Sequence, residues 1–223
     1  MLTLALAQQC TVSWPQSLQW LAPGERARLA TQGSPARRQQ FLAGRWLLRQ
    51  LASTGPLDID AEGRSHRPQG HANLSHSGGW VLAGAADGPV GVDLEALRPR
   101  RDVMGLARMV LGAGQCEALQ VLPPDAALVA FYRSWTLKEA WFKARGQGLD
   151  LTLIQRLDFA PVRAHGGEAA PAADSACAVL HAVGLVLAVH QPRGLGALPD
   201  SLAGYRLPWQ RFVSGVLDGC PAA

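Results

Sequence analysis

Lysine is almost absent from this sequence, which has only two lysines in 223 residues against 19 arginines. Both occur within residues 135–143, at Lys138 and Lys143, on either side of Glu139. Because arginine serves wherever a diffuse positive charge is enough, two retained ammonium groups suggest chemistry that a guanidinium performs poorly. Glu139 and Lys143 are also four residues apart, so an ordinary helix-stabilising pair is the alternative interpretation.

Other absences exclude whole classes of protein. The four cysteines lie far apart without a CxxC motif, which argues against a zinc site or a disulfide framework and favours a reducing compartment. The sequence has no run of about 18 uncharged apolar residues, so we predict no transmembrane helix. Residues 1–10 are apolar but lack a basic residue and are too short for a secretory signal. We therefore expect a soluble cytoplasmic protein.

The charge balance is mildly basic. Hydrophobic residues make up 48% and charged residues 17% of the chain, as in a folded domain. A net charge of +4 and a pI near 9.2 favour a polyanionic cofactor or an acidic partner. The arginines are scattered in small groups without a basic tail or an arginine–aromatic stripe, which argues against nucleic-acid binding.

Two segments predict the principal helices. The first covers about residues 35–52, with Ser34 as a plausible N-cap. The second starts after two prolines with Asp125 as the expected N-cap and ends near Gly146.

Each predicted helix is followed by strand-like segments. After the first come residues 71–75, 80–86 and 89–95, the last two as a hairpin around Asp87-Gly88; after the second come residues 153–161, 176–181 and 185–190. The order of one helix and three strands thus occurs twice. We expect an α+β fold of two similar halves, residues 1–100 and 101–223, related by a pseudo-twofold repeat. Each half would pack a main helix on a small, mainly antiparallel sheet, with a ligand cleft between the halves.

Residues 91–95 (GVDLE) end a predicted strand. Side chains alternate along a strand, so Asp93 and Glu95 share one face. Two such carboxylates repel each other unless water or a cation separates them. Carboxylates and water suit magnesium, whereas a solvent-facing strand end is the alternative.

Residues 73–79 (NLSHSGG) place Ser75 and His76 just before a glycine pair. Small polar groups and open backbone amides can form a phosphate cradle. An ordinary turn with a solvated histidine is the alternative. The absence of a GxSxG motif argues against a serine hydrolase.

Taken together and in this order, residues 73–77, 91–95 and 135–143 resemble the Sfp-type 4′-phosphopantetheinyl transferase family. That family's pattern is an apolar residue, glycine, an apolar residue, aspartate, any residue and glutamate, followed later by an aromatic residue, a small polar residue, Lys-Glu-Ala/Ser and a final lysine. The resemblance covers roughly residues 63–149.

The resemblance implies a monomer with coenzyme A bound between two similar α+β halves. It implies that Asp93, Glu95 and Glu139 hold magnesium on the coenzyme diphosphate. Lys143 would contact phosphate, with Lys138 beside it.

The resemblance also implies contacts to the coenzyme in the first half. Ser75 and His76 would contact its phosphate groups, and Arg64 would reach the nucleotide. This chain departs from the family at Arg64, because Ser65 stands where the family usually has proline; Pro68 could restore the turn. Arg45 resembles a family arginine near the 3′-phosphate, and Arg38 is the alternative.

The implied activity moves the 4′-phosphopantetheine arm of coenzyme A to a serine of an apo carrier protein and releases adenosine 3′,5′-bisphosphate. The leaving phosphate's charge needs neutralising, which a metal and an ammonium can do. Glu139 is the candidate base and Lys143 the group that stabilises charge on the transferred phosphoryl group. A non-catalytic binding module for coenzyme A or a carrier, and a magnesium-dependent phosphodiesterase, are the competing hypotheses.

The partner would be an acidic acyl or peptidyl carrier protein of fatty-acid, polyketide or nonribosomal peptide synthesis, which the sequence does not distinguish. Arg98, Arg100 and Arg101 follow Glu95 closely and are candidates to steer such a carrier electrostatically. A solvated loop after the strand is the alternative.

Overall fold

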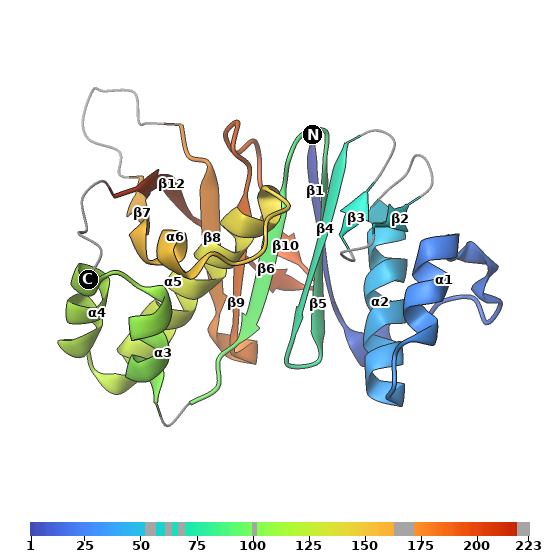
Figure 1. Ribbon diagram of the computed structural model, residues 1–223, viewed down its shortest axis with the longest axis horizontal. Helices are drawn as coiled ribbons and strands as arrows, with labels where there is room; N and C mark the ends of the chain where they lie inside the picture. The colour runs from blue at the N-terminus through green and yellow to red at the C-terminus, as the bar shows by residue number, and fades with distance from the viewer. Residues whose placement is uncertain (52–56, 61–63, 67–69, 100–101, 163–171, 218–223) are drawn as a thin grey trace.

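The computed structural model describes residues 1–51, 57–60, 64–66, 70–99, 102–162 and 172–217, and these form an α+β fold as expected. Figure 1 shows four layers: helices α1 and α2, one sheet, a second sheet, and helices α3–α6. The two sheets face each other in the middle of the molecule. Each sheet therefore has helices on its outer face.

The first lobe is built on an antiparallel sheet. Its strand order is β1-β5-β4-β3-β2. The bounds are β1 Leu2–Gln8, β2 Asp58–Ile59, β3 Ser65–His66, β4 His71–Ser77 and β5 Trp80–Ala86. Helix α2 (Pro35–Leu51) packs against β4 and β5, and α1 (Pro23–Ala30) lies outside it. Two short 3-10 helices, η1 Gln9–Thr11 and η2 Leu18–Trp20, precede α1.

The second lobe has an antiparallel sheet of strand order β6-β9-β8-β12-β7. The bounds are β6 Gly91–Ala96, β7 Leu157–Pro161, β8 Ser175–Leu180, β9 Leu185–His190 and β12 Gln210–Val216. Its helices are α3 Val103–Val110, α4 Ala113–Gln120, α5 Pro124–Ala144 and α6 Leu151–Arg156. The 3-10 helix η3 (His181–Val183) joins β8 to β9, and β10 (Ser201–Leu202) pairs with β11 (Tyr205–Arg206).

Apolar side chains of β6 fill the space between the two sheets. Val92 and Leu94 are buried there against residues of β1, β5 and β9, Leu82 and Leu187 among them. Strand alternation therefore turns Asp93 and Glu95 to the opposite face, toward α5. The same side-chain alternation that forms the inter-sheet core supplies the carboxylates of the candidate site.

Gly91 allows α5 to approach β6 closely. A Cβ atom at this position would lie 1.9 Å from the carbonyl oxygen of Ala140 and 2.5 Å from the backbone nitrogen of Ala144. No side chain fits there, so the glycine is required by the close contact between strand and helix. This contact brings the carboxylates of β6 next to the polar face of α5.

The long helices and the β8–β9 connection are where the sequence predicts them. Ser34 caps α2 as predicted, with its Oγ accepting from the backbone nitrogen of Arg37 at 3.2 Å. Two other local predictions are wrong. Asp125 lies in the first turn of α5 and does not cap it. Residues 151–156 form α6, so the strand expected from residue 153 begins only at Leu157.

The predicted hairpin around Asp87-Gly88 does not form. β5 pairs with β4 and β1, whereas β6 crosses to the other sheet and pairs with β9. The actual hairpin joins β4 to β5 through Gly78 and Gly79, whose φ angles of 59° and 83° favour glycine. By sheet membership the two lobes divide between β5 and β6, earlier than the expected division near residue 100.

None of the helices in the described ranges is both long enough and apolar enough to span a bilayer.

Candidate active site

The candidate site lies where β4, β6 and α5 meet. Three polar side chains of β4 (Asn73, Ser75 and Ser77) face β6 and bond to it. Asn73 Oδ1 accepts from the backbone nitrogen of Val92 at 3.0 Å, and Ser77 Oγ accepts from that of Ala96 at 3.1 Å. These side chains link the two lobes along the length of the site.

The strand expected over residues 71–75 extends to Ser77, so both motif residues lie in a strand, and this determines what they contact. Because neighbouring side chains point to opposite faces of a strand, Ser75 and His76 reach different surroundings. Ser75 is buried against β6, whereas His76 is exposed and lines a pocket in the first lobe.

Asp93, Lys143 and Ser75 form a hydrogen-bonded cluster. Lys143 Nζ lies 2.6 Å from Asp93 Oδ1 and 3.0 Å from Ser75 Oγ, and Ser75 Oγ donates to the same Asp93 oxygen at 2.7 Å. Asp93 Oδ2 is buried without a hydrogen-bond partner among the described residues. One oxygen of this carboxylate thus has two donors and the other has none.

Glu95 and Glu139 complete the acidic surroundings. Glu95 Oε2 accepts from Ser77 Oγ at 2.8 Å, and Glu95 Oε1 accepts from Trp135 Nε1 of α5 at 3.2 Å. The pKa of Glu139 is raised to about 7, mainly by burial and also by the nearby charges of Asp93 and Glu95, with Lys143 opposing the shift. The negative charge of this cluster exceeds what Lys143 alone compensates.

A hard divalent cation fits this donor set chemically. The oxygen ligands that magnesium prefers are present, one of them a buried carboxylate oxygen without a partner. As the side chains lie, no three acidic, histidine or cysteine residues in the described part of the chain are grouped closely enough to hold a metal ion. A cation here would therefore require Lys143 or a carboxylate to move.

Lys138 does not belong to this site. It is fully buried, and its Nζ donates to the backbone oxygens of Val110 at 2.9 Å and Ile154 at 2.7 Å. A third bond, of 2.8 Å, goes to Gln115 Oε1. Burial lowers the pKa of Lys138 to about 8. The expectation that Lys138 lies beside the coenzyme phosphate is therefore wrong, because this ammonium fastens α5 to the ends of α3 and α6 and to α4.

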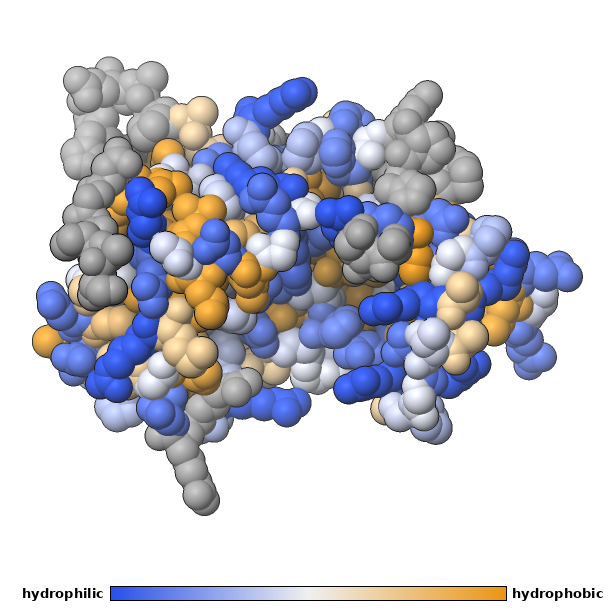
Figure 2. All heavy atoms as spheres, viewed as in Figure 1, coloured by the Kyte–Doolittle hydropathy of each residue, from blue (hydrophilic) through white to orange (hydrophobic). Residues whose placement is uncertain are grey.

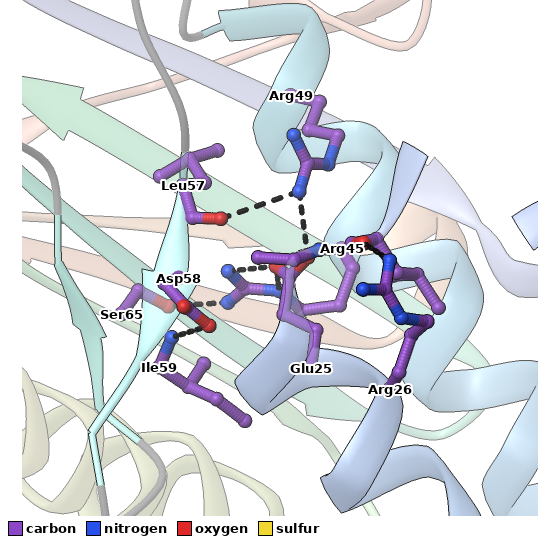
Figure 3. Close-up of polar contacts among 10 residues, drawn as sticks. Glu25, Arg26, Arg45, Arg49, Leu57, Asp58, Ile59 and Ser65 are labelled. Atoms are coloured by element: carbon purple, nitrogen blue, oxygen red, sulfur yellow. Dashed lines mark hydrogen bonds and ion pairs between the residues drawn. The ribbon is translucent and has the colours of Figure 1, made fainter. Parts of the chain in front are cut away.

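Arg45 is also engaged by the protein itself (Figure 3). It is 2% exposed, and its Nε donates to Glu25 Oε1 at 2.5 Å while Nη1 donates to Ser65 Oγ at 2.5 Å. Glu25 is fully buried and also receives Arg49 Nη2 at 2.6 Å. A buried carboxylate left without its partners is costly, so this triad holds α1, α2 and β3 together. Arg45 lines the pocket but its charge is already paired.

The pocket in the first lobe has a volume of about 380 Å³ and a basic lining. Arg28, Arg37, Arg64 and His76 contribute to its wall, together with Arg45. Arg28 and Arg37 are exposed arginines that the sequence analysis did not assign to the site. Arg38, the alternative to Arg45, donates to the backbone oxygen of Leu29 at 3.1 Å instead. In Figure 2, hydrophilic side chains are dense over the side occupied by α1 and α2.

Arg64 connects this pocket to the second lobe. Its Nε donates to Asp60 Oδ2 at 2.6 Å, and its Nη1 donates to the backbone oxygen of Gly146, just after α5, at 2.7 Å. The turn attributed to Pro68 lies outside the described residues, as do Arg100 and Arg101. Arg98 is exposed at the end of the segment that follows β6.

Comparison with known proteins adds independent support for the motifs. Residues 89–183 match the family model of the 4′-phosphopantetheinyl transferase superfamily. The chain is 39% identical over 133 residues to 4′-phosphopantetheinyl transferase AcpT of Escherichia coli K12, covering 56% of this chain and 66% of that protein. It is 33% identical over 144 residues to 4′-phosphopantetheinyl transferase HetI of Nostoc sp. PCC 7120, covering 58% and 61%.

A third relative is the 4′-phosphopantetheinyl transferase of Bacillus subtilis, 34% identical over 86 residues, which are 39% of this chain and 38% of the relative. The matched regions span less than two thirds of these relatives' own lengths. They support the resemblance that the three motifs indicate, and residues 89–183 of this chain are similar to the 4′-phosphopantetheinyl transferase superfamily.

Proposed function

We propose that this chain transfers the 4′-phosphopantetheine arm of coenzyme A to a serine hydroxyl of an apo acyl or peptidyl carrier protein, releasing adenosine 3′,5′-bisphosphate. The observation that carries the proposal is the adjacency of two features. An acidic cluster with one lysine (Asp93, Glu95, Glu139 and Lys143) lies beside β4, and a basic pocket opens on the other face of the same strand. A diphosphate-linked nucleotide needs both kinds of surroundings.

The basic pocket suits the nucleotide end of coenzyme A. Its volume of about 380 Å³ falls within the usual range for a ligand site. Arg28, Arg37 and His76 offer donors for phosphate oxygens, because guanidinium groups bind phosphate with two parallel hydrogen bonds. We assign the 3′-phosphate to Arg28 and Arg37 in preference to Arg45, whose guanidinium is occupied by Glu25.

The acidic cluster suits the diphosphate with a divalent cation. Asp93, Glu95 and Glu139 would hold Mg²⁺, which when bound would supply charge neutralisation for the diphosphate. Lys143 reaches into the same cluster and would contact the phosphate that is transferred. Ser75, beside Lys143, would contact a phosphate oxygen by turning the hydroxyl that now donates to Asp93.

The reaction balances with these groups alone. The carrier's serine oxygen forms a bond to the phosphorus that bears the pantetheine arm, and the bond from this phosphorus to the bridging oxygen breaks. The leaving group keeps that oxygen and departs as adenosine 3′,5′-bisphosphate. Glu139 accepts the serine proton directly or through a water molecule. Its pKa of about 7 before cation binding suits a base at neutral pH.

We propose further that the chain acts as a cytoplasmic monomer, with its two helix-on-sheet lobes related by a pseudo-twofold repeat. Both lobes of one chain supply the site, through Ser75 and His76 from one and Asp93 and Lys143 from the other. The free thiols of Cys116 and Cys177 are compatible with a reducing compartment.

The test is incubation of the protein with coenzyme A, Mg²⁺ and a panel of apo carriers from fatty-acid, polyketide and nonribosomal peptide synthesis, read by intact mass. We expect at least one carrier to gain the mass of one phosphopantetheine on its serine. No gain on any carrier, together with measurable coenzyme A binding, would favour a non-catalytic binding module of the same fold.

A further inference from the structure

The environment of Asp93 is asymmetric in a way that the proposed reaction does not itself explain. Asp93 is 3% exposed, and its Oδ1 receives both Lys143 Nζ at 2.6 Å and Ser75 Oγ at 2.7 Å. Its Oδ2 is equally buried but has no partner among the described residues. A buried carboxylate oxygen without a donor is costly, so the site is incomplete as it stands.

The ammonium of Lys143 compensates the negative charge of Asp93, and it has room to move away from that carboxylate. Its side chain is 27% exposed, whereas Lys138 five residues earlier is fully buried. A lysine carries its charge on a flexible four-carbon stem, so the ammonium can move while the helix stays in place. Lys143 makes its two side-chain bonds, to Asp93 and Ser75, across the space between α5 and β4–β6.

A divalent cation and the Lys143 ammonium compete for the same carboxylate. A cation that bound Asp93 Oδ2 would lie within a few Å of the ammonium on Oδ1, and like charges at such a distance repel strongly in a partly buried site. The ammonium would then need a new anionic partner. The diphosphate of the substrate is an anion that arrives at this place in the proposed reaction.

We propose that Lys143 is the internal counter-ion of Asp93, that a divalent cation displaces it, and that the displaced ammonium pairs with the arriving diphosphate. Lys143 thus couples cation binding to diphosphate binding. The cation binds weakly to the free protein, because it must break the Lys143–Asp93 pair. It binds tightly with coenzyme A, because the phosphate offers Lys143 a replacement. This inference rests on the proposed function only for the identity of the diphosphate.

Thermodynamic linkage makes the coupling reciprocal and measurable. Mg²⁺ must strengthen coenzyme A binding by the same factor by which coenzyme A strengthens Mg²⁺ binding. Adenosine 3′,5′-bisphosphate carries the nucleotide and the 3′-phosphate but no diphosphate, so it should give little of this coupling. It is the matched ligand control.

The first experiment is isothermal titration calorimetry, with Mg²⁺ titrated into the wild-type protein and into Lys143→Met. Each protein is titrated alone, with coenzyme A and with adenosine 3′,5′-bisphosphate. The heat of Mg²⁺ binding to free coenzyme A is measured separately and subtracted. In the absence of ligand, Lys143→Met should bind Mg²⁺ more tightly than wild type, by roughly tenfold, a usual size for such a coupling. In wild type, coenzyme A should increase the affinity for Mg²⁺. In Lys143→Met this increase should be smaller and approach the one that adenosine 3′,5′-bisphosphate gives. Arg108→Met, which removes one exposed positive charge from α3, should bind Mg²⁺ like wild type.

Three outcomes would overturn the proposal. They are equal or weaker Mg²⁺ binding by Lys143→Met, an undiminished effect of coenzyme A in that variant, and no Mg²⁺ binding to either protein under any condition.

The second experiment uses the rarity of lysine. Protein labelled with [¹⁵Nζ]lysine carries two side-chain ammonium groups, Lys138 and Lys143. On addition of Mg²⁺ alone, the Lys143 resonance should shift, whereas the Lys138 resonance, from an ammonium held by three buried acceptors, should stay as the internal reference. A Lys143 resonance that does not move at saturating Mg²⁺ contradicts the proposal. Neither experiment involves a carrier or turnover, so failure here is distinguishable from failure of the transferase assay.

Discussion

Lys138 and Lys143 lie five residues apart on α5, yet their ammonium groups occupy opposite environments. Lys138 Nζ is wholly buried and bonds to Val110, Gln115 and Ile154, whereas Lys143 Nζ lies 2.6 Å from Asp93 at the junction of the two lobes. One lysine is thus structural, and the other belongs to the candidate active site.

The two lysines should separate stability from activity. Lys138→Met takes this donor from the buried backbone oxygens of Val110 and Ile154, whereas Gln115 Oε1 still accepts from the backbone nitrogen of Gly112, so we expect the free energy of unfolding to fall by about 3 kcal/mol. Lys143→Met removes an ammonium that is 27% exposed, whose place water can take, so it should lower the free energy of unfolding by less than Lys138→Met does, while lowering transfer by about 100-fold or more. Urea denaturation and the carrier assay measure the two effects. A Lys138→Met protein as stable as wild type, or a Lys143→Met protein less stable than Lys138→Met, would contradict the assignment.

The basic pocket should recognise the 3′-phosphate. Arg28→Ala and Arg37→Ala should each raise the KM for coenzyme A by roughly tenfold, since a charge-assisted hydrogen bond contributes about 1.5–3 kcal/mol. The same variants should show little change in KM for 3′-dephospho-coenzyme A. Arg108→Ala, outside the pocket, is the control. Equal effects of Arg28→Ala and Arg37→Ala on both substrates would mean that these arginines serve another part of the coenzyme.

His190 should make the fold acid-sensitive. Its Nε2 contacts Arg145 Nη1 at 3.2 Å, and its Nδ1 contacts Ser175 Oγ at 2.8 Å. Because arginine only donates, Nε2 accepts and the ring is neutral. Burial lowers the pKa of His190 to about 4; nearby Asp174 opposes this shift, and Arg145 adds to it.

The unfolded state therefore binds a proton near pH 6.5 that the folded state binds only near pH 4. Stability is full above pH 6.5 and falls by about 3 kcal/mol as the pH drops toward 4. Unfolding free energies measured between pH 7 and 4 should show this slope in wild type and in His181→Gln, whose ring is exposed. His190→Gln should lose it, and an unaltered slope in that variant would assign the acid sensitivity to other groups.

Arg98 should steer an acidic carrier if the docking surface follows β6. We expect Arg98→Glu to raise the KM for the carrier severalfold and to leave the KM for coenzyme A nearly unchanged. The same holds for Arg100 and Arg101, which lie outside the described residues. The wild-type KM for the carrier should also rise with salt, because exposed charges are screened within about 10 Å at 0.1 M. If Arg98→Glu leaves the KM for the carrier unchanged at low salt, the alternative interpretation of these arginines as part of a solvated loop is correct.

Local sequence patterns correctly predicted the direction of side chains where the periodicity of one strand or one helix decides it. Alternation along β6 puts Asp93 and Glu95 on one face, and the four-residue step on α5 puts Glu139 and Lys143 on another. Lys138 could not be placed in this way. It precedes Glu139 by one residue, so it points about 100° away around the helix, toward α3, α4 and α6, which the sequence analysis did not predict.

Features that depend on packing between segments far apart in the chain could not be predicted from the sequence. Asp87-Gly88 favours a turn, but whether β6 folds back on β5 or crosses to β9 depends on the apolar core that Val92 forms between the sheets. The pocket arginines Arg28 and Arg37 sit on different helices, and only the packing of α1 on α2 brings them together. The pairing of Arg45 with Glu25 likewise joins residues of these two helices and gives no local signal.

The most direct test of the account is intact-mass measurement of an apo carrier after incubation with coenzyme A, Mg²⁺ and either wild type or Glu139→Gln. The glutamine keeps the shape of the side chain but can neither accept the serine proton nor carry the charge. Wild type should add one phosphopantetheine to the carrier serine, and Glu139→Gln should be slower by about 100-fold or more while still binding coenzyme A. Removal of Mg²⁺ with a chelator should stop the wild-type reaction. Transfer at the wild-type rate by Glu139→Gln, or full transfer in the presence of the chelator, would contradict the account.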